Sequence, residues 1–161
     1  MSDLDSCYLS ALRILKYRFN SAGELKRKLR AKSFADDIIN ETLERLRTEK
    51  WLDDERFASA FVRTRQNKRV GARRIARELG AAGVASDVVR AAIDANADPE
   101  RERADLIALC QKRRLLLSRR KGEEYAASAE GRNKLTIYLL NQGYDSALVR
   151  EIVKETFANH R

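Results

Sequence analysis

An internal repeat constrains the fold of this chain more than any other feature of its sequence. The three segments are SAGELKRKLRAKSFADDIINETL at 21–43, GARRIARELGAAGVASDVVRAAI at 71–93 and GRNKLTIYLLNQGYDSALVREIV at 131–153. Two apolar columns fall in register: Leu25, Ile75 and Leu135, then Leu29, Leu79 and Leu139. Because the two columns are one helical turn apart, they lie on one face of a helix. The pattern predicts the same amphipathic helix three times.

The end of each repeated helix is marked as well. Gly83 and Gly143 suit the left-handed residue that terminates a helix, and Ser33 occupies the same column in the first segment. Apolar residues at helical spacing then resume, which predicts a second helix after each turn. Each segment is therefore a pair of helices joined by a short turn.

The start of the repeated helix carries capping residues. Ser21 and Glu24 form the S-x-x-E pattern of a capping box. Gly71 and Gly131 occupy the column of Ser21, where glycine is an acceptable cap.

A further apolar helical stretch precedes each pair, within 8–19, 57–62 and 106–117, and no segment alternates with the period of a strand. One unit alone would be marginally stable, but stacked units share cores. We therefore expect an all-α tandem repeat of three three-helix units forming an elongated, curved solenoid-like body. The predicted repeats are 1–52, 53–98 and 99–161, and a polar break at 121–131 lengthens the third.

Two adjacent carboxylates, Asp53 and Asp54, raise the question of a metal or acid–base site. They stand between the last helix of the first unit and the first helix of the second. Asp53 suits an N-cap, and Asp54 places negative charge against the positive end of a helix. No histidine or third carboxylate completes a metal site. We interpret the pair as structural caps, together with Ser21, Glu24, Gly83 and Gly143.

The net charge of +9 makes an anionic partner plausible, and three basic runs are candidates for the contact. From Arg63 to Arg77 there is no acid. The candidate binding residues in the three runs are Arg63, Arg65, Lys68, Arg69, Arg73, Arg74 and Arg77; Lys26, Arg27 and Arg30; and Lys112, Arg113, Arg119 and Arg120. A charge run is often only a solvated face, but three runs at related places in the repeats favour a surface that meets phosphates or an acidic protein.

The sequence gives little support to an enzyme. The one histidine, His160, is next to the C-terminus, and there is no phosphate-binding glycine loop. Cys7 and Cys110 match no metal spacing and are interpreted as reduced thiols. We expect no catalytic residue, no metal and no cofactor. No signal peptide or membrane span is visible, so a cytoplasmic protein without membrane contact is expected.

The string WLDDERFASAFVRTRQNKRVGARRIARELGAAGV at 51–84 resembles the signature of the RecX family. The capping pattern at 21–29, the length and the three-unit plan extend the resemblance over nearly the whole chain. Ser33 and Ala85 depart from the family's usual turn residues. The resemblance implies a regulator, mainly an inhibitor, of the RecA recombinase. Such proteins lie in the groove of the RecA–DNA filament and suppress ATP hydrolysis, strand exchange and filament growth, in homologous recombination, DNA repair and the SOS response.

Two other interpretations remain open. The chain could be a non-specific DNA-binding helical repeat protein without a dedicated protein partner, or an adaptor whose basic faces bind an acidic protein. A helix–turn–helix reader of DNA sequence is disfavoured, because the second helix of the first unit is acidic. We expect a monomer that binds RecA and the single-stranded DNA within its filament, with DNA alone as a further candidate.

Overall fold

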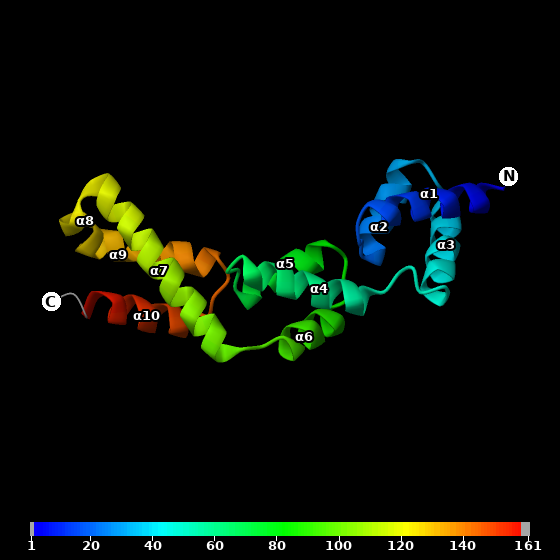
Figure 1. Ribbon diagram of the computed structural model, residues 1–161. Coiled ribbons are helices and arrows are strands. Elements are labelled where there is room, and N and C mark those ends of the chain that lie inside the picture. Colours follow the sequence, from blue (N-terminus) through cyan, green and yellow to red (C-terminus); the bar gives the residue numbers. More distant parts are fainter. Residues whose placement is uncertain (1, 159–161) are drawn as a thin grey trace. The chain divides into compact units, whose positions relative to one another are not determined.

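The computed structural model describes residues 2–158, and within that range the chain forms helices and no strand (Figure 1). The helices are α1 (Asp3–Tyr17), α2 (Ala22–Ala31), α3 (Asp36–Thr48), α4 (Asp54–Asn67), α5 (Ala72–Ala81), α6 (Ser86–Ala95), α7 (Pro99–Lys121), α8 (Glu123–Ala127), α9 (Ala129–Asn141) and α10 (Ser146–Ala158). The predicted all-α class is confirmed. The helix pairs α2–α3, α5–α6 and α9–α10 coincide with the three repeated segments.

The helices gather into two compact units. One contains Met1–Val62 and Glu78–Ala95, and the other contains Arg63–Arg77 and Asn96–Arg161. This division cuts α4 after Val62 and α5 after Arg77, so the middle repeat contributes to both units. The repeat boundaries proposed from the sequence mark where equivalent sequence segments begin and end. The compact units are the groups of helices that pack together.

In the first unit, α3 packs against both α1 and α2. The repeat columns of α2 supply Leu25 and Leu29, which are fully buried together with Ile39 and Leu46 of α3. Burying one leucine side chain stabilises a fold by roughly 1.5–3 kcal/mol. The apolar register found in the sequence is thus the core of this unit.

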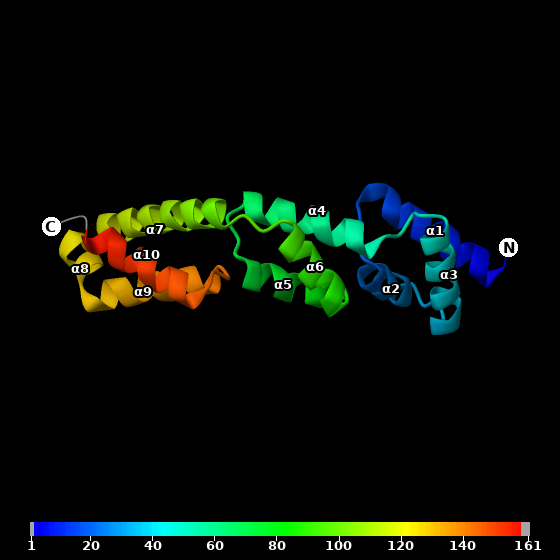
Figure 2. The same cartoon turned by 90° about the horizontal axis from the view of Figure 1, so that it is seen from below.

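In the second unit, α7, α9 and α10 lie side by side (Figure 2). Leu106 and Cys110 of α7 meet Leu135 and Leu139 of α9, and Val149 of α10 closes the same core. The equivalent columns of the first and third repeats are therefore buried in equivalent ways.

The polar break of the third repeat contains a short helix, α8. Ser128, after α8, accepts a hydrogen bond from the Gly131 N–H at 3.1 Å and is the N-cap of α9. The prediction that Gly131 caps this helix is wrong, because α9 begins before it and Gly131 is buried in the first turn. A Cβ on Gly131 would lie 2.2 Å from the carbonyl oxygen of Tyr125. The absence of a side chain at this position therefore allows α8 and α9 to pack closely.

The turn that follows each repeated helix has a residue of positive φ. The angles are 67° at Ser33, 79° at Gly83 and 95° at Gly143. A serine in this region is strained by about 1–2 kcal/mol relative to glycine. The first repeat therefore uses the same left-handed turn as the other two, at a small energetic cost.

Candidate functional site

The side-chain carboxylates of Asp53 and Asp54 each accept a hydrogen bond from a backbone N–H group. Asp53 Oδ1 accepts a hydrogen bond from the Arg56 N–H at 3.0 Å, at the start of α4. Asp54 Oδ1 accepts one from the Ala22 N–H at 2.8 Å, which ties the start of α4 to the start of α2. In the described part of the chain, no group of three or more potential metal ligands is found. The acidic pair therefore has the contacts of structural caps.

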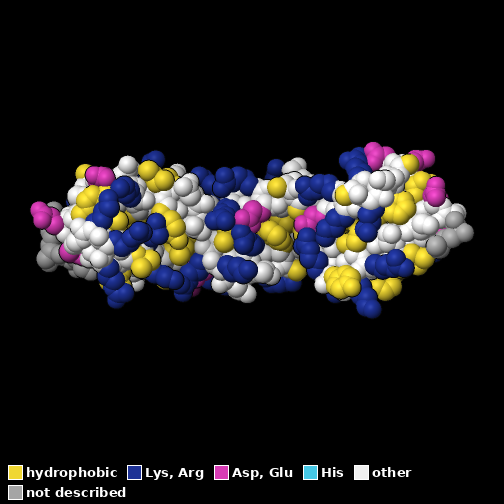
Figure 3. Space-filling model, turned by 90° about the horizontal axis from the view of Figure 1, so that it is seen from above, with side chains coloured by type: hydrophobic (Ala, Val, Ile, Leu, Met, Phe, Trp, Pro, Cys, Tyr) yellow, Lys and Arg dark blue, Asp and Glu magenta, His cyan; other side chains and the backbone are white. Residues whose placement is uncertain are grey.

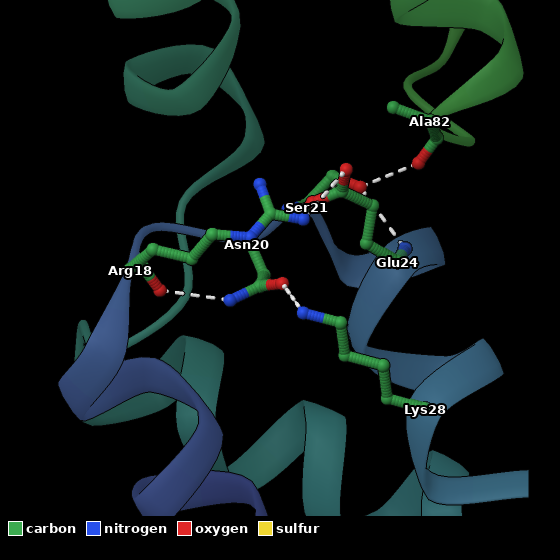
Figure 4. Close-up of polar contacts among 6 residues, drawn as sticks. All are labelled: Arg18, Asn20, Ser21, Glu24, Lys28 and Ala82. Carbon is green, nitrogen blue, oxygen red and sulfur yellow. Dashed lines mark hydrogen bonds and ion pairs between the residues drawn. The ribbon is translucent and has the colours of Figure 1, made fainter. Parts of the chain in front are cut away.

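The start of α2 is held against the turn after α5 (Figure 4). Ser21 Oγ accepts from the Glu24 N–H at 3.1 Å and donates to the carbonyl oxygen of Ala82. A Cβ on Gly23 would lie 2.7 Å from that same oxygen. Ser21 is fully buried, so its hydroxyl satisfies both polar groups where water is excluded.

Asn20 supports this junction from the other side. Its side chain donates to the carbonyl oxygen of Arg18 at 2.8 Å and accepts from Lys28 Nζ at 2.6 Å (Figure 4). Asn20 is only 2% exposed. The chain leading into α2 is thereby fixed by buried hydrogen bonds.

The second unit contains an equivalent junction at the start of α5. Gly71 N–H donates to the carbonyl oxygen of Gln142 at 2.8 Å, and Arg73 N–H donates to that of Gly143 at 3.0 Å. In the repeat alignment Gly71 shares a column with Ser21, and Gln142 shares one with Ala82, whose carbonyl oxygen accepts from Ser21. The same two columns therefore meet in both units. The repeat pattern did not predict this contact, although the small residues Ser21 and Gly71 in one column were a signal for it.

Asp145 connects this junction to the basic run of α5. Its carboxylate pairs with Arg73 at 2.6 Å and accepts from the backbone N–H groups of Ala147 and Leu148. These amides, with a smaller contribution from Arg73, lower the pKa of the Asp145 carboxyl. Arg73 is therefore partly committed to structure rather than to a partner.

Of the other cations in the Arg63–Arg77 run, some have partners within the chain and others form no ion pair. Arg69 pairs with Asp105 at 3.5 Å, and the half-buried Arg74 donates to Gln142 Oε1 at 3.3 Å. Arg63 and Arg65 also have intramolecular partners. Lys68 and Arg77 are exposed and form no ion pair with any side chain of residues 2–158. Within this run, Lys68 and Arg77 are the cations most available to a partner.

The two remaining runs show the same mixture. Lys26 donates to Asn40 at 2.9 Å, and Arg30 holds Asp36 with two bonds of 2.6 and 2.7 Å, which lowers the pKa of the Asp36 carboxyl. The Arg113 guanidinium lies 4.4 Å from the ring centre of Tyr138. Among the candidate residues of the three runs, the exposed cations without an ion pair to a described side chain are Arg27, Lys68, Arg77, Lys112, Arg113, Arg119 and Arg120.

The basic character is visible on the surface. On the face drawn in Figure 3, lysine and arginine side chains are much more plentiful than acidic ones over both units. Exposed ion pairs are worth about 0–1 kcal/mol, so Arg30 and Arg73 can also exchange their carboxylates for an external anion. Exposed cations of this kind can bind phosphates or carboxylates.

Each cysteine belongs to one of the two apolar cores. Cys7 and Cys110 are both fully buried, and burial raises the pKa of the Cys110 thiol. His160 lies outside the described residues. Over residues 2–158, no helix is both long enough and apolar enough to cross a membrane.

Fold and surface together define a class: an all-helical protein built from repeated three-helix segments, with many exposed cations on its surface. Two family models match the chain. The first three-helix domain of RecX matches residues 7–46, and the second matches residues 53–93.

Curated relatives named "Regulatory protein RecX" extend the match. The relative from Xanthomonas oryzae pv. oryzae is 34% identical over 140 residues, which cover 87% of this chain and 82% of the relative. The one from Clostridium botulinum is 28% identical over 92% of this chain and 68% of its own length. The one from Geobacillus thermodenitrificans is 41% identical over 87 residues, which span only 32% of that longer protein. The chain belongs to the RecX family.

Solved structures agree on the fold. The crystal structure of RecX from Lactobacillus salivarius superposes with a TM-score of 0.78 at 24% identity, covering 95% of this chain and 96% of that one. A second crystal structure of a regulatory protein RecX gives a TM-score of 0.81 at 21% identity, over 95% of this chain and 72% of the other.

Proposed function

We propose that the chain regulates the RecA recombinase, mainly as an inhibitor. It binds in the groove of the RecA–DNA filament and suppresses ATP hydrolysis, strand exchange and filament growth. The proposal is supported by membership of a family whose relatives are named regulatory proteins. Its partners are the RecA filament and the single-stranded DNA within it, and the chain acts as a monomer in the cytoplasm, without catalysis or a cofactor.

The observation that carries the proposal is the set of exposed cations without an ion pair to a described side chain. Lys68 and Arg77 represent the central basic run, and Lys112, Arg119 and Arg120 represent the run on α7. Such side chains gain phosphate contacts without first losing an internal partner, and each contact releases counterions from the nucleic acid. Their spacing along several helices suits an extended anionic surface better than a small ligand.

The test measures the DNA-dependent ATPase and the strand exchange of RecA with increasing amounts of this protein. The affinity for bare single-stranded DNA is measured at the same salt concentration. Inhibition at amounts too small to coat the DNA supports action on the filament. If inhibition appears only when the DNA is saturated, the chain is a non-specific DNA-binding repeat protein and the proposal is wrong.

Charge reversal refines this test. Lys68→Glu combined with Arg77→Glu is expected to weaken inhibition by about tenfold or more, because two attractive contacts become repulsive. Arg13→Glu combined with Arg90→Glu is the matched control, since it changes the net charge equally and both arginines are exposed outside the three basic runs. Equal loss in both variants would show that net charge, rather than these positions, determines binding.

A further inference from the structure

An apolar groove in the first unit lies outside all three basic runs. It has a volume of about 520 Å³ and is lined by Leu12, Leu15, Lys16, Phe19, Lys50, Trp51, Asp53 and Arg56. Pockets that hold ligands commonly measure roughly 300–1,000 Å³. We call it the Trp51 groove.

The backbone holds Trp51 outward at the edge of this groove. Lys50 has a φ of 63°, and the N–H groups of Trp51 and Leu52 both donate to the carbonyl oxygen of Leu46, at 2.9 and 3.2 Å. Leu52 is 3% exposed, whereas Trp51 is 57% exposed. The turn therefore buries one apolar side chain and presents the other.

Phe19 forms the opposite apolar edge. It follows the end of α1 and is 53% exposed. The Arg56 guanidinium lies 5.0 Å from the centre of its ring. Leu12 and Leu15 of α1, which are half-buried, supply aliphatic lining between the two aromatic residues. Exposed apolar side chains gathered around one hollow are typical of a binding surface rather than of scattered surface residues.

The charge of the groove identifies the chemistry of its occupant. Lys16, Lys50 and Arg56 are exposed and form no ion pair with any side chain that the structure describes. Asp53 is the one acidic residue of the lining, and its carboxylate already accepts the Arg56 N–H. An occupant that combines an apolar side chain with carboxylates would match both features.

We propose that the Trp51 groove binds a peptide segment of another protein in which an aromatic or leucine side chain is flanked by acidic residues. The apolar side chain fills the space between Trp51 and Phe19, and the carboxylates contact Lys16, Lys50 and Arg56. A single nucleic-acid strand fits less well. One face of the Phe19 ring is covered by Arg56, and the aliphatic lining offers nothing to the polar edges of a base.

This inference goes beyond the proposed function and does not depend on it, because the test contains neither RecA nor DNA. Trp51 is the only tryptophan of the chain, so its fluorescence reports on the groove directly. The probe is a short synthetic peptide with a central Leu-Phe pair between aspartate and glutamate residues. Titration of the protein with this peptide is expected to shift the fluorescence emission of Trp51 to shorter wavelength, and the shift is expected to saturate.

Variants with matched controls test the two halves of the proposal. Phe19→Ser is expected to weaken peptide binding by about tenfold or more, since it removes one apolar edge. Tyr17→Ser is its control, because Tyr17 is 89% exposed and does not line the groove. Lys16→Glu with Arg56→Glu is expected to weaken binding to a similar degree, whereas Arg13→Glu with Arg90→Glu, at two exposed arginines outside the groove, leaves it unchanged.

Several outcomes would overturn the proposal. They are the absence of a saturable shift, equal binding of a peptide with Ser-Ser in place of Leu-Phe, and equal loss in Tyr17→Ser and Phe19→Ser. If oligothymidine produces the same shift with the same sensitivity to Phe19→Ser, the groove is a nucleic-acid site instead. Far-UV circular dichroism confirms that each variant is folded before its affinity is compared.

Discussion

Gly71 and Gly143 approach each other so closely that a Cβ on Gly71 would lie 2.3 Å from the carbonyl carbon of Gly143. The Gly71 N–H also donates to the carbonyl oxygen of Gln142, so the approach brings two backbones into direct contact. Ser21 makes the equivalent contact with Ala82 in the other unit. Small residues at Ser21 and Gly71 are therefore required by the packing of one repeat start against the turn of the following repeat.

Gly71→Ala is expected to lower the free energy of unfolding by about 1–3 kcal/mol, because the added methyl group has only backbone to displace. Gly80→Ala is the matched control. Nothing lies within 4 Å of a Cβ at Gly80 in α5, so alanine there is expected to stabilise by about 0.5–1 kcal/mol. Urea denaturation followed by circular dichroism measures both. Equal midpoints for Gly71→Ala and the unchanged chain would contradict the close approach.

Ser21→Ala tests the equivalent junction in the first unit. It removes the cap of α2 and the bond to Ala82, with an expected loss of about 2 kcal/mol. Ser2 has a capping box of the same kind at the start of α1, but it is exposed and has no distant partner. Ser2→Ala is therefore expected to lose about 1 kcal/mol or less. The difference between the two variants measures the buried bond to Ala82.

The repeat made the helices and the core predictable from the sequence. Leu25, Leu29, Leu135 and Leu139 are buried where the apolar columns placed them, since helical spacing alone determines which residues share a face. Gly131 shows the limit of this reasoning. Its column suggested a cap, but the extra helix α8 moved the start of α9 and turned the glycine into a packing position.

The candidate site was less predictable, because charge runs do not reveal their partners. The sequence made Arg73 a candidate contact for an anionic partner, but Asp145, far along the chain, pairs with it. The outward position of Trp51 depends on the turn at Lys50, whose positive φ leaves no clear signal in a lysine. Such pairings depend on which distant residues the packing brings together.

Asp53→Ala and Asp54→Ala are each expected to lower stability by about 1 kcal/mol, for different reasons. The first removes the N-cap of α4, and the second leaves the Ala22 N–H without its acceptor. Asp54→Asn keeps an acceptor oxygen and is expected to lose less. Thermal melts with Mg²⁺, Mn²⁺ or a chelator are expected to coincide for the unchanged chain. A shift of the melting temperature by metal that disappears in Asp53→Ala would show that the acidic pair binds an ion.

Glu102 of α7 gives the stability a predictable dependence on pH. Burial, followed by repulsion from Asp145, raises the pKa of the Glu102 carboxyl above its ordinary 4.5. The folded state therefore holds this proton more tightly than the unfolded state. The resulting stability is fully present below pH 4.5 and is lost as the pH rises through the raised pKa.

Glu102→Gln is accordingly expected to raise the melting temperature at pH 7, with a gain that shrinks as the pH falls toward 4.5. The neutral amide has a similar shape and avoids the burial of a charge. Glu100→Gln, exposed in the first turn of the same helix, is expected to give no such gain, since it loses a favourable charge at the helix start. A gain in Glu102→Gln that stays constant between pH 4 and 8 would contradict the burial effect.

Cys7 and Cys110 allow the stability of the two units to be measured separately. Each thiol is fully buried, one in each unit, so it reacts with a thiol reagent only when its surroundings open. Single-thiol variants, Cys7→Ser and Cys110→Ser, assign the two rates. In these backgrounds, Ser21→Ala is expected to accelerate the labelling of Cys7, whereas Gly71→Ala accelerates that of Cys110. If either substitution accelerates both thiols equally, the two units open together, and the shared middle repeat couples them into one cooperative structure.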